Sequence, residues 1–165
     1  MKVSKGIAQR VLIIAYGNPL RCDDGIAWQA AEELRRKFAS NTEVSIICVH
    51  QLTPELAEDV SCAETVIFMD ATQNEKTGKL ACEQVALQPG ALHLSHHLAP
   101  GEVLAFSNQL YGANPRGFLI SIHGEHFDHG NTLSATAINA LPQVVTTVTD
   151  LVKRAESLQI QSQQS

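Results

Sequence analysis

The sequence predicts an α/β fold, a three-layer sandwich in which helices cover both faces of a mostly parallel, twisted sheet of about five strands. Continuous apolar runs, typical of strands buried on both faces, alternate along the chain with segments whose apolar residues recur at helical spacing. A length of 165 residues fits one domain, and neither an internal repeat nor a linker divides the chain. We therefore expect a single domain over residues 1–165.

The first half of the chain alternates strands and helices. The apolar run VLIIAY (11–16) predicts a buried strand. DDGIAWQAAEELRRKF (23–38) predicts a helix, because its apolar residues keep helical spacing and its acidic start and basic end suit the helix dipole. EVSIICVH (43–50) and TVIFMDA (65–71) predict further strands, and TPELAEDV (53–60) predicts a short helix between them.

The second half continues the pattern with a more exposed strand and a longer helix. LACEQVAL (80–87) alternates as an exposed strand does, and GFLISIHG (117–124) is another apolar strand. GEVLAFSNQLYG (101–112) and the segment 135–155 have helical spacing. The polar tail from about residue 157 is expected to be frayed or disordered.

The composition limits the compartment and the partners. With a net charge of -5, the chain lacks the excess of positive charge that attracts nucleic acid or an anionic membrane. No apolar run approaches the ~20 residues that span a bilayer, and the N-terminus lacks a signal-peptide pattern. The 4 cysteines are widely spaced and form no CxxC pair. We expect a cytoplasmic protein, a monomer, that binds neither nucleic acid nor membrane.

Acidic side chains follow two of the predicted strands. Asp23 and Asp24 come shortly after the first strand, and Asp70 ends the third. Ligands of parallel sheets bind beyond the carboxyl ends of the strands, so these loops should converge on one crevice. A simpler role for each acid is a helix or turn cap, which accounts for one of the adjacent pair. A ligand or acid–base role for the other remains open.

The loop that carries the acid pair, GNPLRCDDG, excludes several common sites. It lacks GxGxxG, and its two carboxylates would repel a pyrophosphate. Gly17 and Gly25 are expected to allow a tight turn and close packing, and Asn18 to stabilise the turn. No GxSxG nucleophile motif occurs, and the acids would raise the pKa of the Cys22 thiol and so blunt its reactivity.

Six of the seven histidines lie between residues 93 and 129. One imidazole from LSHHL (His96 and His97), together with two carboxylates, would suit a divalent ion, although solvated loop histidines are more common. Adjacent side chains in an extended loop point in opposite directions, so one of the two should face the crevice. The segment HGEHFDHG, with His123, His126 and His129, contains no HExxH. We interpret it as a loop without a catalytic role or as a contact with a partner.

Four segments together resemble the nickel–iron hydrogenase maturation endopeptidases. They are VLIIAYGNPLRCDDGIAW, HQLTPELAEDV, VIFMDA and SHHLAPGEVLAF, in an order and spacing that match from roughly residue 10 to 150. The family trims a C-terminal extension from the hydrogenase large subunit after nickel insertion. HQLTPEL stands where some members have a G-G-T-type turn, which suggests a different hydrogenase partner.

The resemblance implies the residues of the site. Asp24, Asp70 and His96 would be the catalytic residues and the metal ligands, with Gly17, Asn18, Asp23, Gly25 and His97 as the supporting loop residues. The metal would be nickel, supplied by the large-subunit precursor. A chaperone-like protein that senses nickel or the precursor without cutting it is the alternative. A Rossmann-like nucleotide binder is a third hypothesis, disfavoured by the missing glycine motif.

Overall fold

The computed structural model describes the backbone of residues 9–73, 80–88 and 97–162, and the side chains of these ranges from residue 10 to residue 157. Its strands form one sheet in the order β2-β1-β3-β5-β4, parallel except for the antiparallel edge strand β4. The strands are β1 (Gln9–Tyr16), β2 (Val44–Val49), β3 (Ala63–Thr72), β4 (Ala81–Val85) and β5 (Arg116–His123). The predicted mostly parallel sheet is confirmed.

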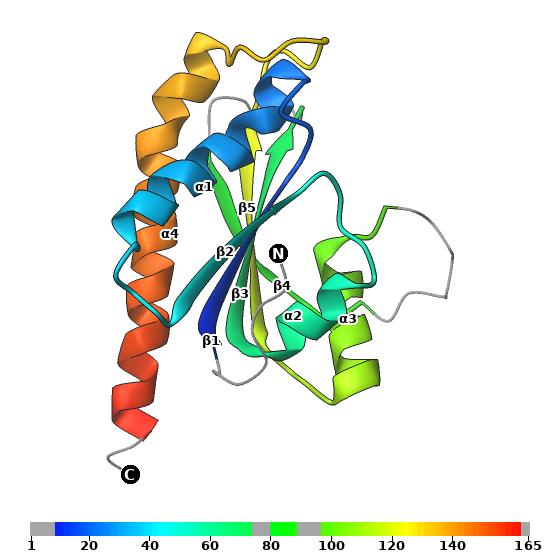
Figure 1. The fold of residues 1–165 in the computed structure, drawn as a ribbon, viewed down its shortest axis with the longest axis vertical. Coiled ribbons are helices and arrows are strands. Elements are labelled where there is room, and N and C mark those ends of the chain that lie inside the picture. Colours follow the sequence, from blue (N-terminus) through cyan, green and yellow to red (C-terminus); the bar gives the residue numbers. More distant parts are fainter. Residues whose placement is uncertain (1–8, 74–79, 89–96, 163–165) are drawn as a thin grey trace.

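Helices cover both faces of the sheet, as the sequence predicts (Figure 1). On one face lie α1 and the long α4, and on the other lie α2 and α3. Their bounds are η1 (Cys22–Gly25, a 3-10 turn), α1 (Ile26–Lys37), α2 (Leu56–Ser61), α3 (Pro100–Tyr111) and α4 (Ala135–Ser162). The strand order reverses at β1, because β2 lies on one side of it and β3 on the other.

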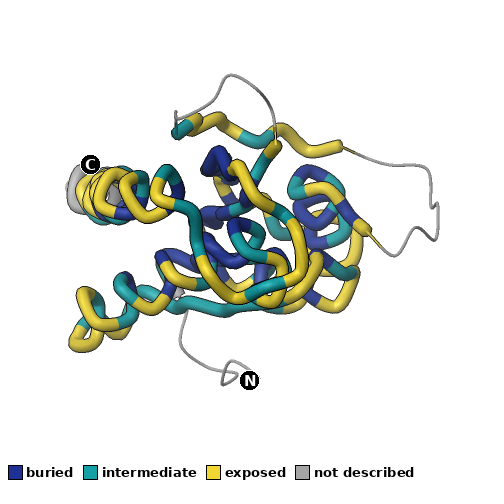
Figure 2. Tube along the Cα trace, turned by 90° about the horizontal axis from the view of Figure 1, so that it is seen from above, coloured by how far each residue is buried: buried dark blue, intermediate teal, exposed yellow. Residues whose placement is uncertain are grey.

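The apolar run of β1 is continuous because both of its faces are covered. Val11, Ile13 and Ala15 belong to the core beneath α1 and α4, and Leu12 and Ile14 belong to the core beneath α2 and α3. All five are fully buried. Figure 2 shows the buried positions gathered on the sheet and on the inner sides of the helices.

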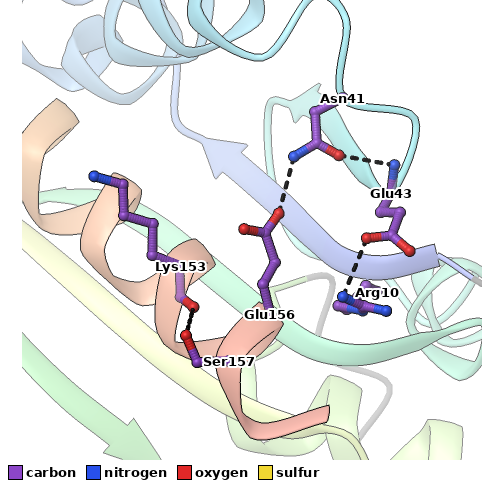
Figure 3. A network of polar contacts seen from close by, with 6 residues as sticks. All are labelled: Arg10, Asn41, Glu43, Lys153, Glu156 and Ser157. Carbon is purple, nitrogen blue, oxygen red and sulfur yellow. Dashed lines mark hydrogen bonds and ion pairs between the residues drawn. The ribbon is translucent and has the colours of Figure 1, made fainter. Parts of the chain in front are cut away.

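The tail that was expected to be frayed or disordered from about residue 157 is helical as far as Ser162, where α4 ends. Near its end the helix is fixed by side chains from the turn before β2 (Figure 3). Asn41 donates from Nδ2 to Glu156 (3.0 Å), and the backbone N–H of Glu43 holds Asn41 in place (3.1 Å). Extending an anchored helix adds one hydrogen bond per residue without a new nucleation cost, so polar residues can follow in the same conformation.

Two further findings concern the described ranges alone. No helix there has the length and apolar character needed to cross a membrane. The cysteines all lie within these ranges, and all are free thiols: Cys22, Cys48, Cys62 and Cys82.

Candidate active site

The loop after β1 is a tight turn that brings Asp24 back toward the strand end. Gly17 has φ +133°, and a Cβ there would lie 2.3 Å from the carbonyl oxygen of Asp24, so only glycine fits. The backbone N–H of Asn18 donates to Oδ2 of Asp24 (2.8 Å). The side-chain Oδ1 of Asn18 accepts from Leu20 N–H (2.9 Å) and stabilises the turn. Gly25 packs closely, because a Cβ there would meet Pro19 Cα at 2.8 Å.

The turn forms one wall of a cavity of about 380 Å³ at the carboxyl edge of the sheet, which we call the acid crevice. Asp24 and Asp70 both line it, so the two acid-bearing loops converge as the strand-end rule predicts. The remaining lining residues come from the ends of β1 and β2 and from the segment before α3: Tyr16, Gly17, Asn18, Arg21, His50, Gln51, Leu52, His97 and Leu98.

Asp70, in the acid crevice, has an acidity that is far from that of an ordinary carboxyl group. Burial raises its pKa to about 7, a hydrogen bond from the Tyr16 hydroxyl opposes the rise, and the Asp24 charge adds to it. Burial and the negative charge of Asp70 also raise the pKa of the Tyr16 hydroxyl far above its usual range, so it remains a donor. At neutral pH the metal-free Asp70 carboxyl therefore exchanges readily between its two protonation states.

Tyr16 and His50 are among the lining residues that were not singled out as site residues in the sequence. Tyr16 ends β1 and bonds Asp70, and His50 directly follows β2. The His50 ring packs against Trp28 of α1, with ring centroids 5.3 Å apart and planes tilted by 57°. Their positions in the sequence could have indicated them, because both residues stand at the carboxyl ends of strands, where ligands of parallel sheets bind.

Asp23 does not cap its own helix, which corrects the capping interpretation. Its side chain is 0% exposed and turns toward the segment between β5 and α4. Oδ2 accepts hydrogen bonds from the backbone N–H groups of Glu125 (2.8 Å) and His126 (3.1 Å). Ser134, directly before α4, donates its N–H to Oδ1 and its hydroxyl to Oδ2, both at 2.7 Å. The acid pair thus divides its roles, because Asp23 fixes a distant loop and Asp24 faces the acid crevice.

The histidine pair is only partly described. His97 is exposed and lines the acid crevice, and His96 lies outside the described residues. Among the residues that the structure describes, no group of three or more His, Cys, Asp or Glu side chains is arranged to hold a metal ion. Asp24 and Asp70 offer hard oxygen ligands and leave coordination positions open, which suits a divalent ion completed by another donor.

The same architecture occurs in solved hydrogenase-processing enzymes. The hydrogenase maturating endopeptidase HybD from E. coli superposes with a TM-score of 0.73 at 20% identity, over 89% of this chain and 94% of that one. The [NiFe] hydrogenase maturation protease HybD from Thermococcus kodakarensis superposes with a TM-score of 0.68 at 22% identity, over 87% and 99%. The chain has the fold of the hydrogenase maturation proteases.

A third structure with the same fold is the hydrogenase 2 maturation peptidase from Thaumarchaeota archaeon SCGC_AB-539-E09. Its TM-score is 0.66 at 23% identity, over 88% of this chain and 99% of that one. No protein-family model matches the sequence, and no curated protein matches it. The two chains coincide over most of their lengths in each structural comparison.

Proposed function

We propose that this protein is an endopeptidase that removes the C-terminal extension of a nickel-loaded [NiFe] hydrogenase large-subunit precursor. The observation that carries the proposal is the meeting of Asp24 and Asp70 in one cavity, on the fold shared with hydrogenase maturation proteases. The four resembling segments support it, since they supply β1 with its loop, the segment after β2, the end of β3 and the start of α3.

The crevice residues supply what peptide hydrolysis needs beside the nickel of the precursor. The nickel would polarise the scissile carbonyl or acidify a water molecule. Asp24 and Asp70 would hold the nickel site against the crevice, with Asp70 oriented by Tyr16. Water then adds its oxygen to the carbonyl carbon, the C–N bond breaks, and the freed amine takes the proton that the water lost.

The deciding experiment uses the purified protein and nickel-loaded precursor. A loss of mass equal to a C-terminal peptide, with the matching peptide released, is the expected result. Stable binding of the precursor without any mass change would instead support the chaperone-like alternative. A precursor of an unrelated nickel protein serves as the control for general proteolysis.

Cleavage is expected to depend on nickel in the precursor. The described residues form no complete metal site of their own, and Asp24 and Asp70 leave positions for a donor or metal brought by the substrate. Precursor prepared without nickel should remain uncut over the time in which loaded precursor is fully processed. Mass spectrometry of both preparations checks this, and equal cleavage of the two would contradict it.

The histidine pair is expected to differ in function. His96→Gln should lose processing by more than about a hundredfold if His96 is a ligand, since even residues that only support ligands cost 10–100-fold. His97→Gln, whose exposed side chain lies on the cavity wall, should retain more than about a tenth of the activity. Parallel assays of cleavage and nickel-dependent precursor binding test the assignment. The reverse order would move the ligand to His97.

A further inference from the structure

A second cavity of about 540 Å³ lies beside the acid crevice. It is lined by Arg21, Gln73, His123, Gly124, Glu125, Phe127 and Asp128. Arg21 lines both cavities, so they meet at its side chain. In Figure 1 the connection from β5 to α4 stands at the same end of the sheet as the start of α1. The volume is in the range of cavities that bind ligands in proteins, about 300–1,000 Å³.

The walls of the second cavity are held by hydrogen bonds between segments far apart in the sequence. The buried Asp23 carboxylate fixes the backbone of Glu125 and His126. Arg21 donates from Nε to the carbonyl oxygen of Phe127 (3.2 Å), which holds the guanidinium at the junction of the cavities. Gly124 N–H donates to Thr72 O (3.0 Å) and continues the pairing of β3 with β5 past the end of the strand. The walls of the second cavity are therefore held in place by the fold at the carboxyl ends of the strands.

One wall carries a buried polar group without a protein partner. His123 ends β5, pairs in register with Thr72, and is only 7% exposed. Its Nδ1 atom is buried and has no hydrogen-bond partner among the described residues. Leaving such a group unpaired costs free energy, so buried polar atoms normally have partners. The His123 residue also lines the second cavity, so a ligand bound there would lie next to it.

We propose that the second cavity is a substrate subsite that binds a polar stretch of the precursor on one side of the scissile bond. This inference rests on the proposed function. A peptide whose scissile bond lies at Asp24 and Asp70 would continue past Arg21 into the second cavity, since extended chain covers about 3.3 Å per residue. The lining offers a cation, two carboxylates, an amide and an imidazole, which pair with backbone and polar groups rather than apolar side chains.

The test compares variants of the second cavity with a variant of the same loop that lines neither cavity. His123→Phe removes the unpaired nitrogen, and Gln73→Ala and Asp128→Ala change exposed side chains, where substitutions usually alter stability little. His129→Ala is the control, because His129 is exposed and absent from both linings. Steady-state cleavage is measured on the nickel-loaded precursor that the unmodified protein cleaves. Binding is measured with a synthetic peptide spanning its cleavage site.

Each cavity variant should raise KM about five- to tenfold with kcat within about twofold, the size expected for one lost hydrogen bond. Peptide affinity should fall in parallel, and His129→Ala should match the unmodified protein. Unchanged KM and peptide affinity in Gln73→Ala and Asp128→Ala, together with unchanged values in any folded His123→Phe protein, would overturn the subsite. If the unmodified protein cleaves no precursor, the proposed function itself fails, which is a separate result.

Discussion

Asp70→Asn is expected to abolish precursor processing and, at the same time, to stabilise the nickel-free protein at neutral pH. The substitution removes the charge but keeps the size of the side chain and an oxygen that can accept from the Tyr16 hydroxyl. Processing should fall by more than about a hundredfold, because a metal-facing carboxylate contributes more than the supporting groups whose loss costs 10–100-fold. Stability should rise because a buried carboxylate near Asp24 is costly to ionise.

The stability gain should depend on pH in a defined direction. Asp70 has an ordinary pKa of 3.8 and a folded pKa of about 7, so between these values the folded protein binds more protons than the unfolded chain. The contribution of Asp70 to folding stability therefore falls as pH rises through that window. Asparagine does not titrate, so the difference between variant and unmodified protein should grow from pH 4 to pH 7. One pKa unit corresponds to about 1.4 kcal/mol, which makes the full difference on the order of a few kcal/mol.

Urea unfolding of metal-free protein at several pH values measures this difference, with precursor cleavage measured on the same samples. Asp24→Asn is the matched comparison. It should also lose processing but gain less stability, because Asp24 is partly exposed and water solvates its charge better than that of a buried carboxylate. An Asp70→Asn protein that retains processing would remove Asp70 from the site. If the folding stabilities of Asp70→Asn and of the unmodified protein changed with pH in parallel, the titration would belong to another group.

The fold could be predicted because its signals are local. The apolar run of β1 and the helical spacing of α1 each reflect how one element meets its neighbours, and that information lies within a short window. The end of α4 could not be predicted in the same way. It depends on Glu156 meeting Asn41, a residue 115 positions away, and nothing in the local composition of the tail indicates that contact.

The site could be predicted only where a rule of topology applied. Asp24 and Asp70 follow neighbouring parallel strands, so their convergence follows from sheet geometry. Tyr16 and His50 obey the same rule, but a single tyrosine or histidine at a strand end has no motif that separates it from core or surface residues. The role of Asp23 was hidden because its partners lie 102 to 111 positions further along the chain.

Asp23→Asn is expected to destabilise the fold by on the order of 3 kcal/mol or more, far beyond the loss of one cap. The Asp23 carboxylate is fully buried and accepts hydrogen bonds from Glu125, His126 and Ser134. An asparagine can accept at one oxygen only, and its NH₂ group would face N–H donors. At least one buried donor would then be unpaired, at about 1–3 kcal/mol each, in addition to the lost charge-assisted bonds.

The pH dependence of this variant should be opposite to that of Asp70→Asn. Burial raises the pKa of Asp23, but the hydrogen bonds from Ser134, Glu125 and His126 outweigh burial and hold the pKa below its ordinary value of 3.8. The stability that Asp23 contributes is therefore fully present above about pH 4 and is lost as the pH falls through the lower folded value. The difference between Asp23→Asn and the unmodified protein should shrink on acidification.

Two controls separate a fixed loop from a simple loss of charge. Asp150→Asn makes the same chemical change on the exposed surface of α4 and should alter stability by less than about 0.5 kcal/mol. Ser134→Ala removes one hydroxyl donor to Asp23 and the bond from Ala137 N–H to Ser134 Oγ, and should cost about 1 kcal/mol. If Asp23→Asn were no more damaging than Ser134→Ala, the carboxylate would not be the anchor of the loop. In that case the wall of the second cavity would have to be fixed by its other hydrogen bonds, such as those of Arg21 and Gly124.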